Sequence, residues 1–403
     1  MAEKAILLIM DGLGDLPAPV KTPLEAAKKP NMDALAKKGM QGMMSTLGRG
    51  VVPGSDTAHL QILGYALDRY YCGRGPLEAL GAGMQLREGD VAFRANFATI
   101  EGNMITDRRA GRLDNASAKL LEKDANARIQ DVEVIFRAST EHRGALVLRG
   151  PGLSPQVSPT DSHREGAFTP AKPLDASDGA RKTAEIVNEF TRMVHARLEG
   201  SDVNKRRMRD GKKPANIILL RGAGIMGKAP KFSEMHGIRG ACVAGGALYK
   251  GVARYAGMDV PDVKGATGDA GTDLKAKGLA ALEALQKNDF VFVHVKATDS
   301  FSHDGNAKGK TQFIEKVDKE LIPALAGNGA ALFITGDHST ACVRKAHTGC
   351  EVPVLAYYAG GRKDGLKKFG ESSAMHGGLG HIEGKDVMLI ILNMIGKGKM
   401  CGS

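Results

Sequence analysis

Three short apolar runs of the chain each lead into an aspartate, and histidines follow two of these aspartates. Carboxylate and imidazole side chains together suit divalent cations such as Mn²⁺, Zn²⁺ or Co²⁺. Six such side chains exceed what one tetrahedral ion needs, so the pattern predicts a site for two metal ions. The candidate metal ligands are Asp11, Asp299, His303, Asp337, His338 and His347.

The three apolar runs must position these side chains. Residues 5–10, 290–295 and 331–336 are short and rich in the residues typical of buried parallel strands. Ligands of open α/β sheets bind beyond the carboxyl ends of the strands, so three such strands would gather the candidate ligands at one rim. A single aspartate at a strand end is most often a helix cap or a turn residue. Three strand ends with the same chemistry favour the metal site instead, as does the spacing of Asp299 and His303, which share one face if that segment is helical.

The segment around Ser55 indicates a nucleophile. The glycine before it permits a tight turn, and the apolar spacing that follows predicts a helix that begins near Ser55. Free N–H groups and the dipole at such a helix start favour an anion. A serine in this position is most often only an N-cap. Beside two metal ions, however, its hydroxyl could be activated without a histidine base, so we expect Ser55 to be catalytic.

The bulk composition limits the class of protein. With 403 residues, two domains are expected, and the contents of 42% hydrophobic and 25% charged residues are ordinary for a globular protein. The N-terminus leads almost directly into the first apolar run, so we expect no signal peptide. The apolar run at residues 387–392 is too short to span a bilayer. Five cysteines without a CxxC pair indicate reduced thiols, and hence a cytoplasmic location.

The net charge of +11 is compatible with a nucleic acid, a membrane surface or an anionic substrate as partner. Part of the excess lies in a basic tract at residues 205–213, which we interpret as a solvated linker. Tryptophan is absent and aromatic residues make up only 5%, so platforms for stacking bases are scarce. The sequence therefore predicts a small anionic substrate, with neither a nucleic acid nor a membrane as partner.

The candidate ligands lie near both ends of the chain, so the fold that carries them must be closed by N- and C-terminal parts together. From about Gly83 onward, strand-like runs alternate with turns, and the basic, polar stretch at residues 200–214 indicates a boundary. We therefore predict a discontinuous core domain of residues 1–82 and 211–403 around an inserted domain of residues 83–210.

Several further motifs are shared with one known family. They lie at residues 10–15, 22–24, 54–59, 73–79, 107–112, 142–144, 220–224, 244–251 and 336–340. In these motifs the chain resembles the alkaline phosphatase superfamily, and more closely the archaeal type of cofactor-independent phosphoglycerate mutase. The resemblance covers nearly the whole chain. It implies an α/β fold, an alkaline-phosphatase-like sandwich with a mostly parallel sheet flanked by helices, plus a smaller inserted α+β domain that binds substrate.

The resemblance also implies the reaction, which is interconversion of 3-phosphoglycerate and 2-phosphoglycerate in glycolysis and gluconeogenesis. It assigns Asp299, His303 and His347 to one metal ion, and Asp11, Ser55, Asp337 and His338 to the other. Ser55 would attack phosphorus and carry the phosphoryl group as phosphoserine while glycerate reorients. The resemblance implies two divalent metal ions, with Mn²⁺ as the first choice and Zn²⁺, Co²⁺ or Mg²⁺ as alternatives. It also implies that the reaction needs no 2,3-bisphosphoglycerate.

The substrate carries a carboxylate and a phosphate, and planar arginine side chains suit both groups. The candidate substrate-binding residues are Asp107, Arg108, Arg109, Arg112, His142, Arg143, His163 and Lys250. Any single arginine among them is more often a solvated surface charge.

Two alternatives to the mutase stay open at this point. One is a metal-dependent phosphatase or a phosphopentomutase-like enzyme of the same superfamily. The other is a basic nucleic-acid-binding protein with a structural metal. An open site that bears a nucleophile, together with the lack of a motif that reads bases, argues against the second alternative.

Overall fold

The computed structural model describes residues 2–17, 21–400 and 402. The chain divides into two compact units, each with its own core. Unit 1 consists of Met1–Tyr71 and Ala229–Ser403, and unit 2 consists of Cys72–Lys228.

Unit 1 is built on a mostly parallel sheet. Its strands are β1 (Ala5–Met10), β2 (Met40–Ser45), β10 (Gly240–Val243), β11 (Phe290–Val295), β12 (Ala331–Thr335), β15 (Val352–Tyr357) and β16 (Gly380–Glu383). Their order is β10-β11-β1-β12-β15-β2-β16, and only β15 runs antiparallel to its neighbours. A separate hairpin joins β13 (Ser339–Ala341) to β14 (Ala346–Thr348). The sheet thus has the mostly parallel architecture that the sequence predicts.

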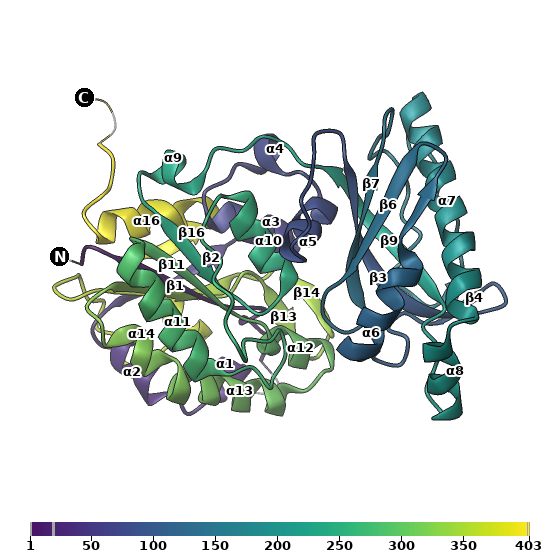
Figure 1. The fold of residues 1–403 in the computed structure, drawn as a ribbon. Coiled ribbons are helices and arrows are strands. Elements are labelled where there is room, and N and C mark those ends of the chain that lie inside the picture. The colour runs from purple at the N-terminus through teal and green to yellow at the C-terminus, as the bar shows by residue number, and fades with distance from the viewer. Residues whose placement is uncertain (1, 18–20, 401, 403) are drawn as a thin grey trace. The chain divides into compact units, whose positions relative to one another are not determined.

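Helices cover both faces of this sheet (Figure 1). The helices of unit 1 are α1 (Pro23–Ala26), α2 (Pro30–Ala36), α3 (Ser55–Ile62), α4 (Leu67–Tyr70), α9 (Phe232–His236), α10 (Ala247–Tyr255), α11 (Leu274–Lys287), α12 (Ala297–His303), α13 (Ala307–Glu320), α14 (Ile322–Ala326), α15 (Glu371–Ala374), α16 (Val387–Met394) and the 3₁₀ turn η2 (Gly384–Asp386). In Figure 1, α11, α13 and α14 lie on one side of the sheet, and α3, α10 and α16 lie on the other.

Side-chain alternation along the strands divides the core of unit 1 into two faces. On β1, Ile6, Leu8 and Met10 share one apolar cluster with side chains of α11, α13 and α14. On β11, His294 points to the opposite face, where its ring lies 5.3 Å from that of His59 on α3 between ring centroids. The first face therefore carries a large apolar cluster, whereas the second carries imidazoles close to the carboxyl ends of the strands.

Unit 2 is an antiparallel α+β unit. Its elements are α5 (Arg74–Gly81), β3 (Val91–Glu101), β4 (Met104–Asp107), α6 (Asn115–Leu121), the 3₁₀ turn η1 (Glu122–Ala125), β5 (Ala127–Ile129), β6 (Val132–Ala138), β7 (Arg143–Arg149), β8 (Gly166–Ala167), α7 (Asp178–Glu199), α8 (Asp202–Arg209) and β9 (Ile217–Ile225). The strand order is β5-β6-β7-β3-β4-β8, and β9 also pairs with β3.

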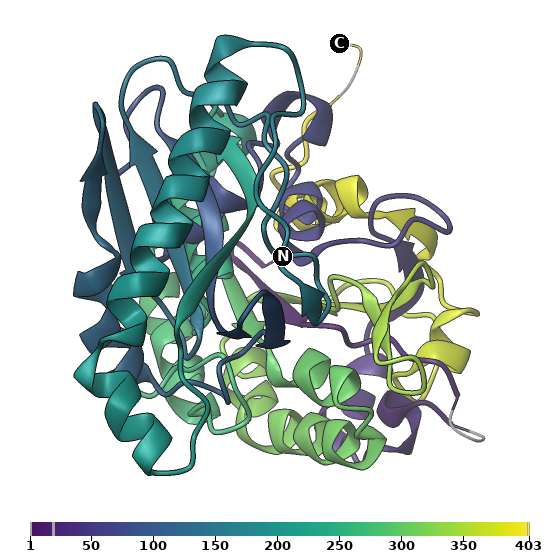
Figure 2. The same ribbon diagram turned by 90° about the vertical axis from the view of Figure 1, so that its right-hand side faces the viewer.

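The long helix α7 lies along one face of this sheet (Figure 2). It begins after Ser177, whose hydroxyl accepts a hydrogen bond from the backbone of Ala180 and so caps the helix. Phe190 and Val194 on its apolar stripe share a core with Phe93 of β3. Across the described residues of both units, no helix is long and apolar enough to cross a membrane.

The bounds of the two units differ from the predicted ones, because residues 72–82 and 211–228 lie in unit 2. Helix α5 lies directly on β3, so close that a Cβ added at Gly75 would come 2.0 Å from the backbone oxygen of Ala92. Strand β9 pairs with β3 over most of its length. Both contacts are non-local, and local composition therefore gave no sign of them.

Candidate two-metal centre

The carboxyl ends of three neighbouring strands bring the candidate metal ligands together. Asp11 follows β1 directly, Asp337 comes shortly after β12, and Asp299 lies in α12, the helix that follows β11. Because β11, β1 and β12 are adjacent and parallel, the three aspartates meet at one rim of the sheet. All three are buried. Buried carboxylates are stable only beside cations or hydrogen-bond donors, so this rim demands positive partners.

The first group of potential ligands surrounds Oδ1 of Asp299. His303 Nε2 lies 3.3 Å from this oxygen and His347 Nε2 lies 3.5 Å from it. Asp299 and His303 share one face of α12, as their spacing predicts. The Nδ1 atom of His303 lies 2.9 Å from the backbone oxygen of Lys345, and that of His347 lies 2.8 Å from the backbone oxygen of Pro53. A proton held on Nδ1 leaves Nε2 free to bind a metal.

The second group is formed by Asp11, Asp337 and His338. His338 Nε2 lies 3.6 Å from Asp11 Oδ1 and 3.2 Å from Asp337 Oδ2. The same nitrogen lies 3.2 Å from the hydroxyl of Ser55. His338 also falls in a compact set with Asp299 and a histidine of the first group. It therefore stands where the two groups meet.

Unpartnered atoms and shifted pKa values fit a divalent cation at this rim. Asp337 Oδ2 is buried and has no hydrogen-bond partner among the described residues. Burial, together with the nearby Asp11 carboxylate, raises the pKa of Asp337 to about 7. Burial also lowers the pKa of His338 to about 3, with His347 contributing, so its imidazole is neutral and able to bind a metal at pH 7. Oxygen and nitrogen donors of this kind bind Mn²⁺, Zn²⁺ or Co²⁺.

Ser55 is the first residue of α3, and Gly54 occupies the N-cap position. Because Gly54 and not Ser55 is the N-cap residue, the common capping role does not account for Ser55. The residue is 4% exposed, and its hydroxyl points to His338 Nε2. Its place at the start of a helix supplies free backbone N–H groups for an anion. The arrangement can present an oxygen nucleophile to a phosphate.

Two residues that hold the ligands in place were not predicted from the sequence. The hydroxyl of Thr340 donates to Asp299 Oδ1 at 2.9 Å and lies 3.0 Å from His338 Nδ1. The backbone N–H of Gly12 donates to Asp337 Oδ1 at 2.9 Å. Gly12 has a φ of +61°, and a Cβ there would lie 2.6 Å from the Thr340 hydroxyl. Only glycine fits this turn without strain, and its position directly after Asp11 was the available signal.

The Asp11 carboxylate is also held by residues that the sequence did not identify. Tyr249 and His294 both donate to Asp11 Oδ2, the latter from Nε2 at 3.0 Å, and their rings stack with centroids 3.4 Å apart. Lys296 donates to Asp11 Oδ1 at 2.9 Å. Burial alone would raise the pKa of Asp11, but Lys296 and His294 bring it well below its ordinary value. The carboxylate is therefore charged and fixed in orientation.

The predicted substrate-binding residues of unit 2 lie in different settings. Asp107 accepts the backbone N–H of Arg109 at 2.7 Å, which shapes the loop after β4. Arg108 forms two hydrogen bonds with the carboxylate of Asp161, at 2.9 and 3.0 Å. The side chains of Arg109 and Arg112 are exposed. Asp107 and Arg108 thus have structural partners, whereas Arg109 extends into solvent.

The remaining predicted residues are divided between the units. His142 is buried in unit 2, and burial together with Arg143 lowers its pKa to about 3. The exposed ring of His163 approaches the guanidinium of Arg221, with 2.6 Å between the nearest nitrogens. Lys250 belongs to α10 in unit 1 and pairs with Asp262 at 3.7 Å.

Partly buried arginines of unit 2 form a cluster that the sequence did not single out. Arg94 on β3 and Arg221 on β9 are register partners, and the Nε atom of each is buried without a hydrogen-bond partner among the described residues. Glu78 lies 3.1 Å from Arg74 and 3.4 Å from Arg94. Burial and the neighbouring Arg74 lower the pKa of Arg94 well below its ordinary value. Buried cationic donors with unused capacity are suited to an anion.

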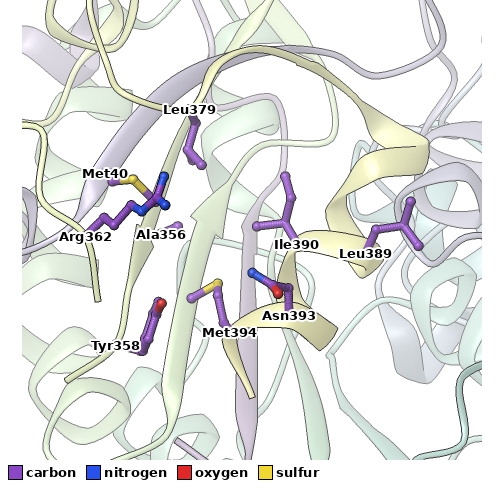
Figure 3. Close-up of a pocket in the computed structure, with 9 residues that line it drawn as sticks. All are labelled: Met40, Ala356, Tyr358, Arg362, Leu379, Leu389, Ile390, Asn393 and Met394. Atoms are coloured by element: carbon purple, nitrogen blue, oxygen red, sulfur yellow. The ribbon is translucent and has the colours of Figure 1, made fainter. Parts of the chain in front are cut away.

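A pocket of unit 1 lies away from the candidate ligands. Its volume is about 590 Å³, and its lining residues are Met40, Ala356, Tyr358, Arg362, Leu379, Leu389, Ile390, Asn393 and Met394 (Figure 3). Met40 begins β2, and Ala356 lies near the end of the antiparallel strand β15. The pocket is therefore at the opposite end of the sheet from the aspartates. Its lining holds no carboxylate or imidazole that could bind a metal.

Comparisons with known proteins agree with this chemistry. Residues 3–394 of the chain match the metalloenzyme superfamily. The chain is 45% identical over 407 residues to 2,3-bisphosphoglycerate-independent phosphoglycerate mutase 1 of Methanocaldococcus jannaschii, with 99% of each chain covered. A solved protein of Pyrococcus horikoshii is 35% identical with a TM-score of 0.86, and both chains are covered completely. The cofactor-independent phosphoglycerate mutase of Thermoplasma acidophilum is 36% identical with a TM-score of 0.67, covering 98% of this chain and 100% of that one.

Proposed function

The chain belongs to the metalloenzyme superfamily and, within it, to the 2,3-bisphosphoglycerate-independent phosphoglycerate mutases, and we propose on this basis that it interconverts 3-phosphoglycerate and 2-phosphoglycerate through a phosphoserine on Ser55. The enzyme is an isomerase, and it needs no 2,3-bisphosphoglycerate. One observation above all supports Ser55 as the nucleophile. Its hydroxyl lies 3.2 Å from His338 Nε2, at the junction of two groups of potential metal ligands.

The proposed metal ligands follow the two groups of the site. One ion would be held by Asp299, His303 and His347, and the other by Asp11, Ser55, Asp337 and His338. The neutral His338 imidazole, and the Asp337 oxygen that has no hydrogen-bond partner among the described residues, support this assignment. Bound divalent ions neutralise phosphate oxygens and lower the pKa of a serine hydroxyl. The mixed oxygen and nitrogen donors favour Mn²⁺, with Zn²⁺, Co²⁺ or Mg²⁺ as alternatives.

The reaction balances without an oxidant, a reductant or a second substrate. Ser55 Oγ attacks the phosphorus of 3-phosphoglycerate, and the bond between phosphorus and the C3 oxygen breaks as the Oγ–P bond forms. Ser55 loses its hydroxyl proton, and the C3 oxygen of glycerate gains one. Glycerate then reorients, its C2 oxygen attacks the phosphoserine, and the serine hydroxyl is restored. Backbone N–H groups at the start of α3 stabilise the transferred phosphoryl group.

We propose that unit 2 contributes the contacts to the anionic groups of the substrate. The candidates are Asp107, Arg108, Arg109, Arg112, His142, Arg143 and His163 of unit 2, together with Lys250 of unit 1. The buried donors of Arg94 and Arg221 that have no hydrogen-bond partner support an anion site in this unit. A mutase must retain glycerate and exclude water while the phosphoserine exists, and charged contacts to the carboxylate serve that purpose.

A metal-dependent phosphatase, or a phosphopentomutase-like enzyme, would use the same metals and the same serine. The names of the relatives favour the phosphoglycerate mutase over both. The two alternatives differ from it in product. A phosphatase would release free phosphate from 3-phosphoglycerate, and a pentose phosphomutase would leave 3-phosphoglycerate unchanged.

The test is an enolase-coupled assay on 3-phosphoglycerate, with and without EDTA, together with a measurement of free phosphate. We expect formation of 2-phosphoglycerate with little free phosphate, loss of turnover after dialysis against EDTA, and recovery with Mn²⁺, Co²⁺ or Zn²⁺. Free phosphate as the main product would contradict the mutase. Full activity of protein shown to be free of metal would contradict the two-metal centre.

A further inference from the structure

Lys296 lies between two carboxylates that we assign to different metal ions. It is the residue between β11 and α12. Its ammonium group lies 2.9 Å from Asp11 Oδ1 and 2.6 Å from Asp299 Oδ2. Asp11 belongs to the group that contains Ser55, and Asp299 belongs to the other group. One fixed positive charge thus bridges the two proposed metal positions.

The individual oxygens show how this ammonium group relates to each metal position. Asp299 turns Oδ1 to the imidazoles of His303 and His347 and leaves Oδ2 to Lys296. Asp11 is different, because its Oδ1 faces both Lys296 and His338. Lys296 therefore contacts Asp11 Oδ1, which is the oxygen that would bind the second metal ion.

The surroundings of Lys296 keep its charge in this place. Its side chain is only 21% exposed, and the ammonium group lies 5.9 Å from the ring centre of Tyr249. The carboxylates of Asp11 and Asp299 both accept hydrogen bonds from this ammonium group and so hold it between them. The other donors to Asp11, Tyr249 and His294, both use Oδ2. They do not compete for the oxygen that faces the metal.

We propose that Lys296 is a resident counter-cation of the metal centre: it stabilises the carboxylates in the metal-free protein and weakens divalent metal binding, most strongly at the position of Asp11, Asp337 and His338. The proposal rests on the proposed function only in its assignment of the metal ligands. A positive charge within hydrogen-bonding distance of two ligand carboxylates repels an incoming cation and occupies part of its coordination. By thermodynamic reciprocity, metal binding must in turn weaken the contacts of Lys296.

A purely structural ion pair predicts the opposite effect. If Lys296 only held the two carboxylates in position, its loss would disorder the ligands and weaken metal binding. The sign of the change in metal affinity therefore distinguishes the two roles.

The experiment compares Mn²⁺ affinities by calorimetry for wild type, Lys296→Met, Lys296→Arg and Lys29→Met. Lys29 is a suitable control, because it is a buried lysine of unit 1 that pairs with Asp33 at 3.6 Å and contacts none of the proposed ligands. We expect Lys296→Met to bind Mn²⁺ about tenfold more tightly or better, within the usual range of such couplings. Lys296→Arg and Lys29→Met should stay near the wild-type affinity, since the first keeps the charge and the second leaves the site intact.

A second measurement reports the metal-free state, namely thermal unfolding in EDTA and in excess Mn²⁺. Lys296→Met should unfold at a lower temperature than wild type in EDTA, and Mn²⁺ should raise its unfolding temperature by more than it raises that of wild type. If the metal-free variant does not fold, competition with a chelator that starts from metal-loaded protein gives the same affinity ratio. Equal or weaker Mn²⁺ binding by Lys296→Met would overturn the proposal. Failure of wild type to bind Mn²⁺ at all would instead refute the metal assignment of the proposed function.

Discussion

At the scale of single residues, the chemistry depends on which atom of each side chain faces the metal positions. The two imidazoles near Asp299 are held through Nδ1 by backbone oxygens, which leaves Nε2 directed into the site. Ser55 is placed differently from a serine that caps its helix, because Gly54 is the cap residue and the Ser55 hydroxyl faces His338 instead. The serine is therefore available for reaction with phosphorus.

Replacing Ser55 by alanine tests this role. We expect Ser55→Ala to reduce turnover in the enolase-coupled assay to background, because the variant lacks the Oγ atom that would attack phosphorus. The variant should fold, as judged by circular dichroism, and should still bind metal at the position of Asp299, His303 and His347. An active Ser55→Ala would contradict the proposed mechanism. A variant that loses both ions would show that Ser55 acts mainly as a ligand.

At the scale of elements, the site follows from the way strands end. The runs at residues 5–10 and 290–295 became β1 and β11 with the predicted bounds, because strands buried on both faces read as continuous apolar segments. The parallel order of these strands then places Asp11 and Asp299 at one rim. Local patterns were sufficient for these features, since each depends on a few consecutive residues.

Features that depend on distant parts of the chain could not be predicted from sequence. Tyr249 donates to Asp11 across 238 residues of sequence, and no local pattern marks it. Lys296 and His294 were visible in the same stretch as Asp299, but only the fold shows that both reach Asp11. The pairing of β9 with β3 likewise decided the bounds of the two units.

The turn after β1 provides a prediction at this scale. Gly12→Ala should lower the free energy of unfolding by roughly 1–3 kcal/mol, because alanine is strained at positive φ. It should also weaken metal binding, since the new Cβ would lie 3.0 Å from Asp299 Oδ1. Urea unfolding and Mn²⁺ titration measure the two effects. Gly380→Ala is the matched control: its φ is +62°, with no atom within 4 Å of the added Cβ, so it should lose stability without losing metal affinity.

The contact between α15 and the start of α1 predicts a pH effect on stability. Thr22 donates to Glu371 Oε2 at 2.6 Å, while Oε1 has no hydrogen-bond partner among the described residues. Burial raises the pKa of Glu371 from 4.5 to about 7. The folded protein thus holds a proton that the unfolded chain releases above its lower pKa, so this residue makes stability fall as pH rises from about 4.5 to about 7.

Glu371→Gln should remove this part of the pH dependence, which amounts to roughly 1–3 kcal/mol. The measurement is urea unfolding of both proteins at pH 5 and pH 8. We expect the variant to equal wild type at pH 5 and to exceed it at pH 8. The same difference between the two proteins at both values of pH would show that Glu371 does not titrate in this range.

At the scale of the whole molecule, we propose that the chemistry is divided between the two units. Unit 1 holds all of the proposed metal ligands and the proposed nucleophile, on one mostly parallel sheet. Unit 2 holds a cluster of arginines on an antiparallel sheet, with buried donors on Arg94 and Arg221 that have no hydrogen-bond partner. This division matches the two demands on a mutase, which are to transfer a phosphoryl group and to retain the acceptor.

The candidate substrate-binding arginines of unit 2, Arg109, Arg112 and Arg143, should control the fate of the phosphoserine. Loss of one charged hydrogen bond to the substrate carboxylate should cost about 1.5–3 kcal/mol. We expect Arg109→Ala, Arg112→Ala or Arg143→Ala to lower mutase turnover and to raise the free phosphate released per 2-phosphoglycerate formed. Arg149→Ala is the control, because Arg149 is engaged with Asp90 at 2.7 Å. An unchanged ratio in all three variants would mean that these arginines are surface charges.

Acid quenching tests most directly whether Ser55 carries the phosphoryl group during turnover. Metal-loaded protein is mixed with excess 3-phosphoglycerate, quenched within one turnover and digested, and the peptides are analysed by mass spectrometry. We expect phosphate on Ser55, formed and lost at least as fast as the enzyme turns over, and none on this residue after treatment with EDTA. Continued turnover without phosphate on Ser55, or phosphate on a different residue, would contradict the account.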